Sequence, residues 1–346
     1  MERGDAPQLK AGDRRRPRTQ VTLRDLAEET GLALSTVSRA LSKPGRVSAE
    51  TSAVVREAAV RLGYRTATAS VLSKRRTALL GLVVSDVTNP FFAELMRGAR
   101  EAGSELGYTL MIIDTQESAD RERATLEQVV GGLDAVVMAS SRMSDSAIRM
   151  IAKQIPTVVL NRHVVGIPSL ITDTDTGMRQ AMRRLSTLGH SRVVYVSGPE
   201  ASWANGIRWR SLQDAAASQR ITVSTLPPSP PTEAGGRAAA DAILQSGATA
   251  VLCYNDIMAI GVIHELSRRG VDVPGQVSVV GWDNIRGAEW VRPLLATVAA
   301  PLRALGRAGV RELVKYVDTG TPPIERPVVL PTKFLARGSI GDAVPR

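Results

Sequence analysis

The chain has 346 residues and a formal net charge of +10, with 43% hydrophobic and 23% charged residues. This composition excludes a disordered protein, and from the length we expect two or more folded units. The single cysteine, Cys253, excludes an intrachain disulfide and a zinc site built from cysteines, and no run of 18 apolar residues could span a membrane.

The positive charge is concentrated at the N-terminus. Residues 1–80 carry 16 Lys and Arg against 8 Asp and Glu, whereas the rest of the chain carries 28 against 26. A basic head on a nearly neutral body is typical of a head that binds a polyanion such as nucleic acid. The first residues are polar and lack the apolar stretch of an export signal, so we expect a cytoplasmic protein with a disordered basic tail over residues 1–19.

Residues 20–63 show the pattern of three short helices. Thr22 and Asp25 are spaced as in a capping box, and apolar residues then recur at helical spacing until Gly31. A second helix follows after a three-residue turn, and a third begins at the capping residue Ser48. The residues expected to face inward are Val37, Ala40 and Leu41 in the second helix and Val54, Val55, Ala58, Ala59 and Leu62 in the third. The sequence therefore predicts an all-α helix-turn-helix head whose second helix fits the major groove.

The segment "VTLRDLAEETGLALSTVSRAL", followed by "RVSAETSAVVREAAVRLGY", resembles the DNA-binding head of the LacI/GalR family, named after the lactose repressor. The resemblance continues over essentially the whole chain from residue 20. It implies a transcriptional regulator, usually a repressor, that binds a palindromic operator as a homodimer under the control of a small, sugar-like effector. The head residues that the resemblance places on DNA are Thr22, Leu34, Ser35, Thr36, Ser38 and Arg39.

The side chains on the second helix differ in what they can recognise. Arg39 can hold a guanine through two hydrogen bonds, Leu34 can only touch a thymine methyl, and Ser35 can bond to either kind of base. Alternatively, Arg39 binds a phosphate and Thr36 caps or packs within the helix pair. The chain has Ala33 where the family usually has a serine that caps this helix, a loss that costs about 1 kcal/mol.

Residues 64–78 are basic and weakly apolar, which makes them a poor isolated helix in water. The resemblance implies a hinge helix that orders on operator DNA, with Ala69 and Leu72 in the minor groove as apolar wedges. The segment departs from the family, because Thr66 replaces the usual proline and the spacing from Tyr64 is one residue shorter. An ordinary flexible tether is the alternative.

From residue 79 onward, apolar runs alternate with amphipathic stretches. The runs are "ALLGLVV", "TLMIID", "AVVMAS", "TVVLN" and "SLIT" in a first set, and "RVVYVSG", "AVLCYND" and "VSVVGWD" in a second. This alternation predicts an α/β body of two doubly wound parallel-sheet subdomains, and the resemblance adds a periplasmic-binding-protein-like arrangement around a cleft. We expect an effector-binding and dimerisation domain over 79–346, with one subdomain over 79–172 plus 300–324 and the other over 175–297 plus 328–340.

Ligands of open parallel sheets bind beyond the carboxyl ends of the strands. Arginine, asparagine and aspartate side chains at such ends suit the vicinal hydroxyls of a sugar, and aromatic walls suit its ring. The resemblance implies effector contacts from Phe91, Phe92, Arg208, Asn255, Trp282 and Asp283. Each has a plainer alternative: the phenylalanines belong to the core, Asn255 and Asp283 cap helices, and Arg208 forms a surface ion pair, while Trp282 is a weaker candidate.

Two other functional classes compete with a regulator. The body alone would suit a binding protein for sugar transport, but the basic head and the polar N-terminus argue against it. An enzyme is disfavoured because the sequence contains no dinucleotide-binding, Walker, nucleophile-elbow or metalloprotease motif, and His163, His190 and His264 lie far apart. We therefore expect no catalytic residues, no cofactor, no metal and no membrane partner.

Overall fold

The computed structural model describes residues 21–42, 47–62, 76–322 and 326–344. They divide into two compact units, one ending at Arg76 and one beginning at Thr77. The predicted basic tail and residues 63–75, which include Ala69 and Leu72, lie outside the described residues. The predictions for the hinge therefore stay predictions.

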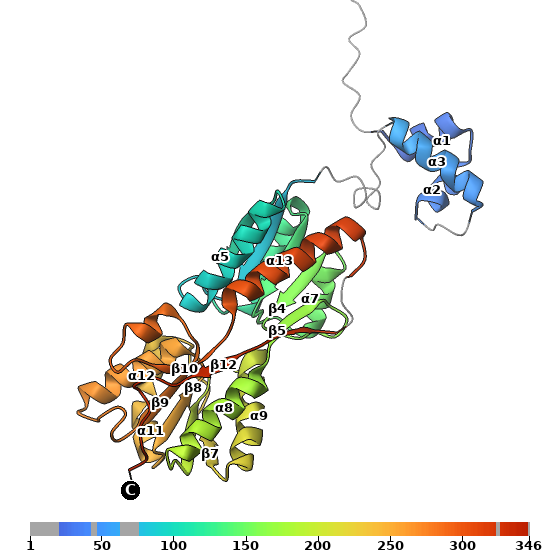
Figure 1. Cartoon of the computed structure of the whole chain (residues 1–346). Helices are drawn as coiled ribbons and strands as arrows, with labels where there is room; N and C mark the ends of the chain where they lie inside the picture. The colour runs from blue at the N-terminus through green and yellow to red at the C-terminus, as the bar shows by residue number, and fades with distance from the viewer. Residues whose placement is uncertain (1–20, 43–46, 63–75, 323–325, 345–346) are drawn as a thin grey trace, which may run out of the picture. The chain divides into compact units, whose positions relative to one another are not determined.

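The N-terminal unit is a three-helix head made of α1 (Leu23–Thr30), α2 (Leu34–Ser42) and α3 (Ala49–Leu62), labelled in Figure 1. Helix α1 begins at a capping box in which the Asp25 amide donates to the Thr22 hydroxyl, and it ends at Gly31, whose φ of +64° favours glycine. The head closes over a small core that contains Leu26, Val37, Ala40, Val55, Ala58 and Ala59. The predicted helix-turn-helix is confirmed.

One residue of the head does not lie where the sequence predicts. Val54 was expected to face inward, but 46% of its surface is exposed. The buried face of α3 follows Val55, Ala58, Ala59 and Leu62, which recur at helical spacing. Val54 precedes that series by one residue and is therefore rotated by about 100° away from the core.

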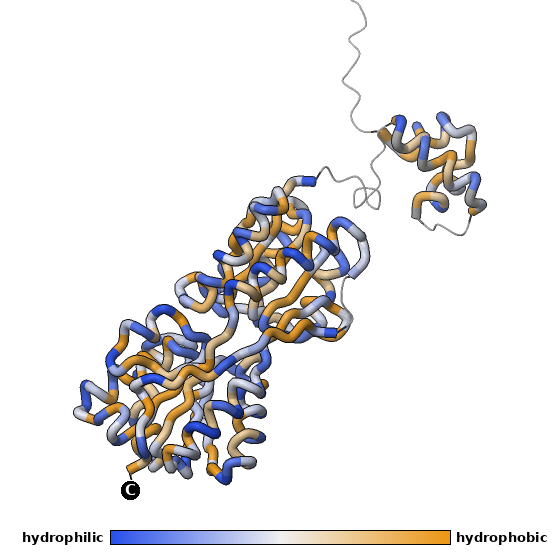
Figure 2. Tube along the Cα trace, in the orientation of Figure 1, coloured by the Kyte–Doolittle hydropathy of each residue, from blue (hydrophilic) through white to orange (hydrophobic). Residues whose placement is uncertain are grey.

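The unit from Thr77 onward contains two six-stranded sheets. The first has the order β11-β5-β4-β3-β1-β2, and its neighbouring strands all pair in parallel. Figure 2 shows hydrophobic residues along the central strands, as expected for strands covered on both faces. The strands are β1 (Leu79–Val84), β2 (Thr109–Asp114), β3 (Ala135–Ala139), β4 (Thr157–Leu160), β5 (Ser169–Thr172) and β11 (Val328–Leu330).

The second sheet has the order β12-β10-β9-β8-β6-β7. Its pairs are parallel except at the edge, where β12 runs antiparallel to β10. The strands are β6 (Arg192–Val196), β7 (Thr222–Thr225), β8 (Ala250–Cys253), β9 (Ser278–Asp283), β10 (Ala296–Ala299) and β12 (Lys333–Leu335). The predicted pair of doubly wound subdomains is therefore confirmed.

Helices cover both sheets (Figure 1). Helices α5 and α13 share one core cluster with the first sheet, and α6 and α7 share another. The helices of the first subdomain are α5 (Pro90–Glu105), α6 (Ala119–Val129), α7 (Asp145–Ala152) and α13 (Leu302–Thr319), with the short 3₁₀ helix η1 (Val130–Gly132). Those of the second are α8 (Thr174–Thr187), α9 (Trp203–Ser218), α10 (Glu233–Ala238), α11 (Ala240–Gln245), α12 (Asp256–Arg268) and η2 (Arg286–Glu289).

The chain passes between the two sheets three times, after β5, after β10 and after β11. The return of α13 to the first subdomain is as predicted. The strand at Val328–Leu330 was expected in the second subdomain, but it pairs in parallel with Leu170–Thr172 at the edge of the first sheet. The apolar letters of "PVVLPTKFLARG" do not distinguish the two sheets, because the short β11 and β12 are separated only by Pro331 and Thr332.

Helices α5 and α13 approach each other unusually closely. A Cβ atom added to Gly98 would lie 1.9 Å from the Arg303 carbonyl oxygen, and one added to Gly306 would lie 2.0 Å from the Leu95 carbonyl oxygen. Only glycine allows such backbone contact. Ion pairs of Arg303 and Arg307 with Glu101 line the same helix pair at its surface.

Candidate functional site

The exposed face of α2 carries the side chains that were predicted to touch DNA. Leu34 is 45% exposed, and Ser35 and Arg39 are exposed beside it. The Arg39 Nε donates to the Ser35 carbonyl oxygen at 3.2 Å, so the guanidinium lies along the helix surface. Helix α2 is amphipathic, and burial of Val37 fixes which side faces outward.

The remaining predicted head residues are less exposed or already engaged. Thr36 and Ser38 are half-buried at the flanks of α2. The Thr22 hydroxyl takes part in the capping box of α1, although the residue stays exposed. The half-buried position of Thr36 is compatible both with packing within the helix pair and with contact to a DNA phosphate.

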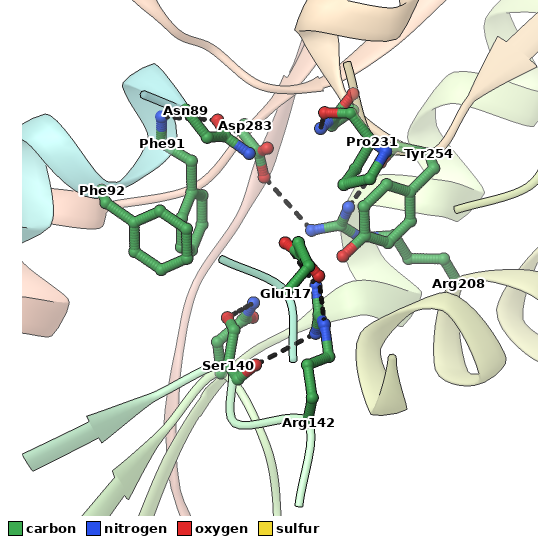
Figure 3. A pocket seen from close by; sticks show the side chains of 12 residues that line it. Asn89, Phe91, Phe92, Glu117, Ser140, Arg142, Arg208, Pro231, Tyr254 and Asp283 are labelled. Carbon is green, nitrogen blue, oxygen red and sulfur yellow. Dashed lines mark hydrogen bonds and ion pairs between the residues drawn. The ribbon is translucent and has the colours of Figure 1, made fainter. Parts of the chain in front are cut away.

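A cleft of about 290 Å³, measured with its open mouth, lies between the two subdomains. Its walls come from segments that follow the carboxyl ends of β1, β2, β3 and β4 on one side and of β8 and β9 on the other, joined by Arg208 of α9 and Pro231. This is the position expected for a ligand of open parallel sheets. The lining residues, shown in Figure 3, are Asn89, Phe91, Phe92, Glu117, Ser140, Arg142, Asn161, Arg208, Pro231, Tyr254, Asn255 and Asp283.

Arg208 is the central cation of the second subdomain's wall. Its Nη2 donates to the Asp283 Oδ1 at 3.1 Å, and its Nη1 donates to the Tyr254 carbonyl oxygen. The guanidinium carbon lies 4.7 Å from the centre of the Tyr254 ring and 4.8 Å from that of the Trp282 ring. The ion pair is buried, with only 5% and 4% of the two side chains exposed, rather than the surface pair that was the alternative.

Asp283 ends β9 in an uncommon backbone conformation, with a φ of +108°. Burial raises the pKa of its carboxyl to about 7, although the charge and hydrogen bond of Arg208 oppose the rise. Asp256 supports the turn after β9, since its Oδ2 accepts from the Ile285 amide at 2.8 Å and its Oδ1 accepts from the Thr297 hydroxyl at 2.6 Å. A held, strained carboxylate at a cleft is typical of a binding residue.

The other predicted residues line the cleft while also serving the fold. Asn255 caps α12 by accepting from the Met258 amide at 3.0 Å, and its Nδ2 donates to the Pro231 carbonyl oxygen at 3.2 Å. Phe91 and Phe92 are 5% and 2% exposed and belong to the core of the first subdomain. Their rings meet edge to face at 4.9 Å. The capping alternative therefore holds for Asn255 and the core alternative for the two phenylalanines, whereas the Asp283 carboxyl caps no described helix and pairs with Arg208.

Trp282 lies differently from its prediction. It is completely buried, and it packs beneath Arg208 instead of lining the cleft. Successive side chains of a strand point to opposite faces, so Trp282 and Asp283 cannot both face the same opening. Trp282 is therefore a support for Arg208 and not a wall of the cleft.

Seven lining residues were not predicted. They are Asn89, Glu117, Ser140, Arg142, Asn161, Pro231 and Tyr254. Arg142 and Glu117 form a two-point ion pair, with Nε–Oε2 and Nη2–Oε1 distances of 2.5 and 3.1 Å. The signal for most of them was present in the sequence, because "DTQES", "ASSRM" and "LNR" follow apolar strands just as "GWDN" does.

Hydrogen-bonding groups thus surround the cleft on both sides, with aromatic rings beside them. Carboxylates, guanidiniums and amides converge there, which suits a ligand with several hydroxyl groups. Among the described residues, no group of three or more His, Cys, Asp or Glu side chains is placed to hold a metal ion. No helix in the described ranges is long and apolar enough to cross a membrane.

Family comparisons agree with both units. Residues 22–67 match the family model for bacterial regulatory proteins of the lacI family, and residues 77–337 match the one for periplasmic binding proteins and the sugar-binding domain of the LacI family. The chain belongs to the LacI family. It is a transcriptional regulator with a helix-turn-helix head and a sugar-binding type of body.

Relatives of this LacI-family chain include the HTH-type transcriptional regulator GalR of Salmonella typhimurium, 32% identical over 81% of this chain and 85% of GalR. A solved complex of the regulator CelR with cellobiose is 28% identical, covers 92% of this chain and 100% of its own, and has a TM-score of 0.68. A LacI-family regulator from Enterococcus faecium with bound ribose is 28% identical over 76% of this chain and 98% of its own, with a TM-score of 0.69.

Proposed function

We propose that this LacI-family protein is a cytoplasmic repressor that binds a palindromic operator as a homodimer and responds to a neutral, polyhydroxylated effector. It carries out no catalysis in this scheme. The single observation that supports the proposal most strongly is the cleft, in which buried Arg208, Asp283 and Asn255 meet Arg142 and Glu117 of the other subdomain. The ligand of such a cleft contacts both halves and therefore favours one closure angle over others.

We assign recognition of the operator's base sequence to helix α2. We infer that Arg39 contacts a guanine edge, that Leu34 contacts a thymine methyl, and that Ser35 bonds to a neighbouring base. We assign phosphate contacts to Thr22, Thr36 and Ser38, and we assign minor-groove contacts to Ala69 and Leu72, which lie outside the described residues. The exposure of Leu34 and Arg39 supports these roles.

Dimerisation is assigned to apolar surface on the body. Trp290, next to η2, is 75% exposed, and Ile112 on the edge strand β2 is 42% exposed. Beside β2 and α5 runs a groove lined by Met96, Tyr108 and Leu110 among others. Large apolar side chains and an uncovered strand edge are unfavourable in a lone monomer, and a second copy of the chain would cover them.

The two activities are coupled through the hinge. The closure angle of the cleft sets the separation of the two chain starts at Thr77 in a dimer, and this separation decides whether both heads reach adjacent major grooves. A coupling free energy of about 2–3 kcal/mol changes operator occupancy by roughly 30- to 150-fold.

The effector class follows from the charges in the cleft. Arg208 is paired with Asp283 and Arg142 with Glu117, so neither guanidinium awaits an anion. A neutral sugar can accept and donate hydrogen bonds there without bringing a new charge. CelR with cellobiose and the Enterococcus faecium regulator with ribose are relatives whose bound ligands have this chemistry.

Gel retardation tests the proposal with the full chain. Fragments of the native genome that contain palindromes are screened for binding, first alone and then with a panel of sugars and polyols. We expect one fragment class to bind and one compound class to alter binding, with affinity falling about 10⁴-fold between 50 and 200 mM salt if eight phosphates are contacted. Failure to bind any palindrome, with or without the panel, would refute the proposal.

A further inference from the structure

The cleft wall of the first subdomain includes a loop, residues 140–143, that follows β3 and carries Arg142. The Arg142 guanidinium donates to Glu117 through Nε and Nη2, and through Nη1 to the Ser140 carbonyl oxygen at 3.0 Å (Figure 3). Only 4% of the Arg142 side chain is exposed. The direction in which this guanidinium points therefore depends on the backbone of its own loop.

Arg162 holds that backbone from the end of the neighbouring strand β4. Its Nη1 donates to the Ser141 carbonyl oxygen at 2.8 Å and to the Met143 carbonyl oxygen at 2.6 Å, one on each side of Arg142 in the chain. Its Nη2 donates to the Asp145 Oδ1 at 2.7 Å, at the start of α7. The Arg162 side chain is only 9% exposed and does not line the cleft. Its contact with the cleft wall is therefore indirect, through the loop.

Three further side chains hold the same loop. The Arg142 amide donates to the Oε2 of Glu122, a completely buried residue, at 3.0 Å. The Ser140 carbonyl oxygen also accepts from the Ser85 hydroxyl at 2.8 Å, and the Asn161 Nδ2 donates to the Ser140 Oγ at 2.9 Å. Buried backbone groups need hydrogen-bond partners. In this irregular loop, side chains supply the partners that a helix or a sheet would otherwise provide.

The strand ends that meet around Arg142 carry uncommon backbone conformations. Glu117, Ser140 and Asn161 have φ values of +59°, +57° and +55°, in the left-handed region that favours glycine. They follow three neighbouring or nearby strands of the first sheet, β2, β3 and β4. Such conformations persist only where surrounding bonds fix them, and they cluster at binding sites. The bonds around Arg142 therefore point to a role in the cleft wall beyond packing of the sheet.

We propose that Arg162 is a positioning residue of the effector site, which fixes the loop at residues 140–143 so that Arg142 faces the effector in one orientation. The inference rests on the proposed effector site and adds to it a residue outside the cleft. Arg162→Lys keeps the positive charge, but a single ammonium cannot replace the planar fork that spans two carbonyls and a carboxylate. Arg142 then takes several orientations, and the effector loses affinity because it must select one of them.

Nuclear magnetic resonance of the full chain, isotope-labelled in its arginines, tests the positioning without effector or DNA. The Arg142 Nε–H signal is assigned by its loss in Arg142→Ala. In the unchanged chain we expect one signal that exchanges slowly with solvent, because this group is buried and bonded to Glu117. In Arg162→Lys, its hydrogen exchange should be at least about tenfold faster. An unchanged exchange rate in Arg162→Lys would overturn the inference, whether or not any sugar binds.

Arg149→Lys is the matched control. Arg149 also donates to Asp145, at 3.4 Å, while its Nε donates to the Val165 carbonyl oxygen and not to the loop. This variant should leave the Arg142 exchange rate unchanged, and equal acceleration in both variants would overturn the role of the loop carbonyls. If thermal unfolding shows that Arg162→Lys does not fold, Arg162→Gln takes its place, because glutamine keeps a planar amide donor.

A double-mutant cycle separates positioning from a general structural role. Ribose and cellobiose, the ligands bound to two relatives, are titrated into the full chain by calorimetry. With the sugar that binds, Arg162→Lys should lower affinity about 3- to 10-fold in the otherwise unchanged chain and not measurably in the Arg142→Ala background. Equal losses in both backgrounds would overturn the positioning role. Binding of neither sugar would count against the proposed effector class, and the exchange rate of Arg142 would still decide the role of Arg162.

Discussion

Arg208 donates to Asp283 at 3.1 Å while its guanidinium carbon lies within 5 Å of the ring centres of both Tyr254 and Trp282, at 4.7 and 4.8 Å. The two rings favour a flat cation, and the carboxylate fixes its rotation. Arg208 is therefore presented to the cleft in one orientation. Such pre-organisation lowers the entropy that a ligand loses on binding.

Arg208→Lys should abolish the effector response while operator binding without effector remains. A lysine ammonium has no flat face for the two rings, and it cannot donate to Asp283 and the Tyr254 carbonyl in a fork. We expect effector affinity to fall at least tenfold, measured by titration calorimetry on the full chain. Arg210→Lys on the same helix serves as the control, and equal losses in both variants would contradict this role.

Asp283 should make folding stability depend on pH. Its folded pKa of about 7 exceeds the ordinary value of 3.8, so between these values the folded state holds a proton that the unfolded state has released. The contribution of this group to the free energy of unfolding therefore decreases as the pH rises from about 4 to 7, by at most about 1.4 kcal/mol per pH unit. At pH values above about 7 the contribution no longer changes with pH.

Denaturant titrations of the unchanged chain and of Asp283→Asn, repeated from pH 5 to 8, give the free energy of unfolding at each pH. The contribution of Asp283 is the difference between the two proteins in the slope of that free energy against pH. Asp241→Asn is the control, because Arg269 lowers the pKa of that carboxyl and moves its effect below the window. Parallel curves for the unchanged chain and Asp283→Asn would show that Asp283 is ionised throughout.

Arg39→Ala should weaken operator binding by about 1–3 kcal/mol and relax specificity at one guanine, if Arg39 reads a base edge. A phosphate contact would instead lower affinity for all sequences alike. Competition binding against single-base operator variants separates the two cases. Arg61→Ala on α3, where the side chain is 62% exposed and pairs with Glu29, should keep the same sequence preference as the unchanged chain.

Gly98→Ala should destabilise the body by about 1–3 kcal/mol or more, because its methyl group would collide with the Arg303 carbonyl and push α5 from α13. Thermal unfolding of the full chain measures the loss. Gly206 offers the matched control: it also lies within a helix, but a Cβ there meets nothing within 4 Å. Gly206→Ala should be neutral or stabilising, by up to about 1 kcal/mol.

Trp290→Glu should convert the dimer to a monomer, with the dissociation constant raised about 100-fold, as expected for an aromatic side chain at the centre of an interface. Sedimentation velocity measures the assembly state. Val165→Glu is the control, because Val165 is also highly exposed, at 67%, but lies on the turn between β4 and β5. A dimer that survives the Trp290 change would move the interface elsewhere.

The sequence predicted the head and both sheets because their signals are local. The Thr22–Asp25 capping box and the wholly buried strand Ala135–Ala139 are visible in short windows. Assignment of Val328–Leu330 failed because the choice of sheet depends on partners more than 150 residues away. The burial of Val54 was predicted wrongly because a shift of one residue along a helix is enough to turn a side chain from the core toward solvent.

The cleft was predicted in part. Five of the six proposed effector residues line it, and Trp282 does not because neighbouring strand residues face opposite ways. Arg142 and Glu117 were missed although they follow strands β3 and β2. Their pairing joins residues 25 positions apart, and only the parallel sheet brings the ends of their strands to one edge.

The interleaved path of the chain affects how the protein emerges from the ribosome. The first sheet obtains its covering helix α13 and its edge strand β11 from residues 302–330, which are made only after almost all of the second subdomain. The earlier subdomain must therefore wait until synthesis nears its end, with only α5 on the sheet face that α5 and α13 cover together. A premature stop codon before residue 302 would leave the part of that face that α13 covers permanently open to aggregation or proteolysis.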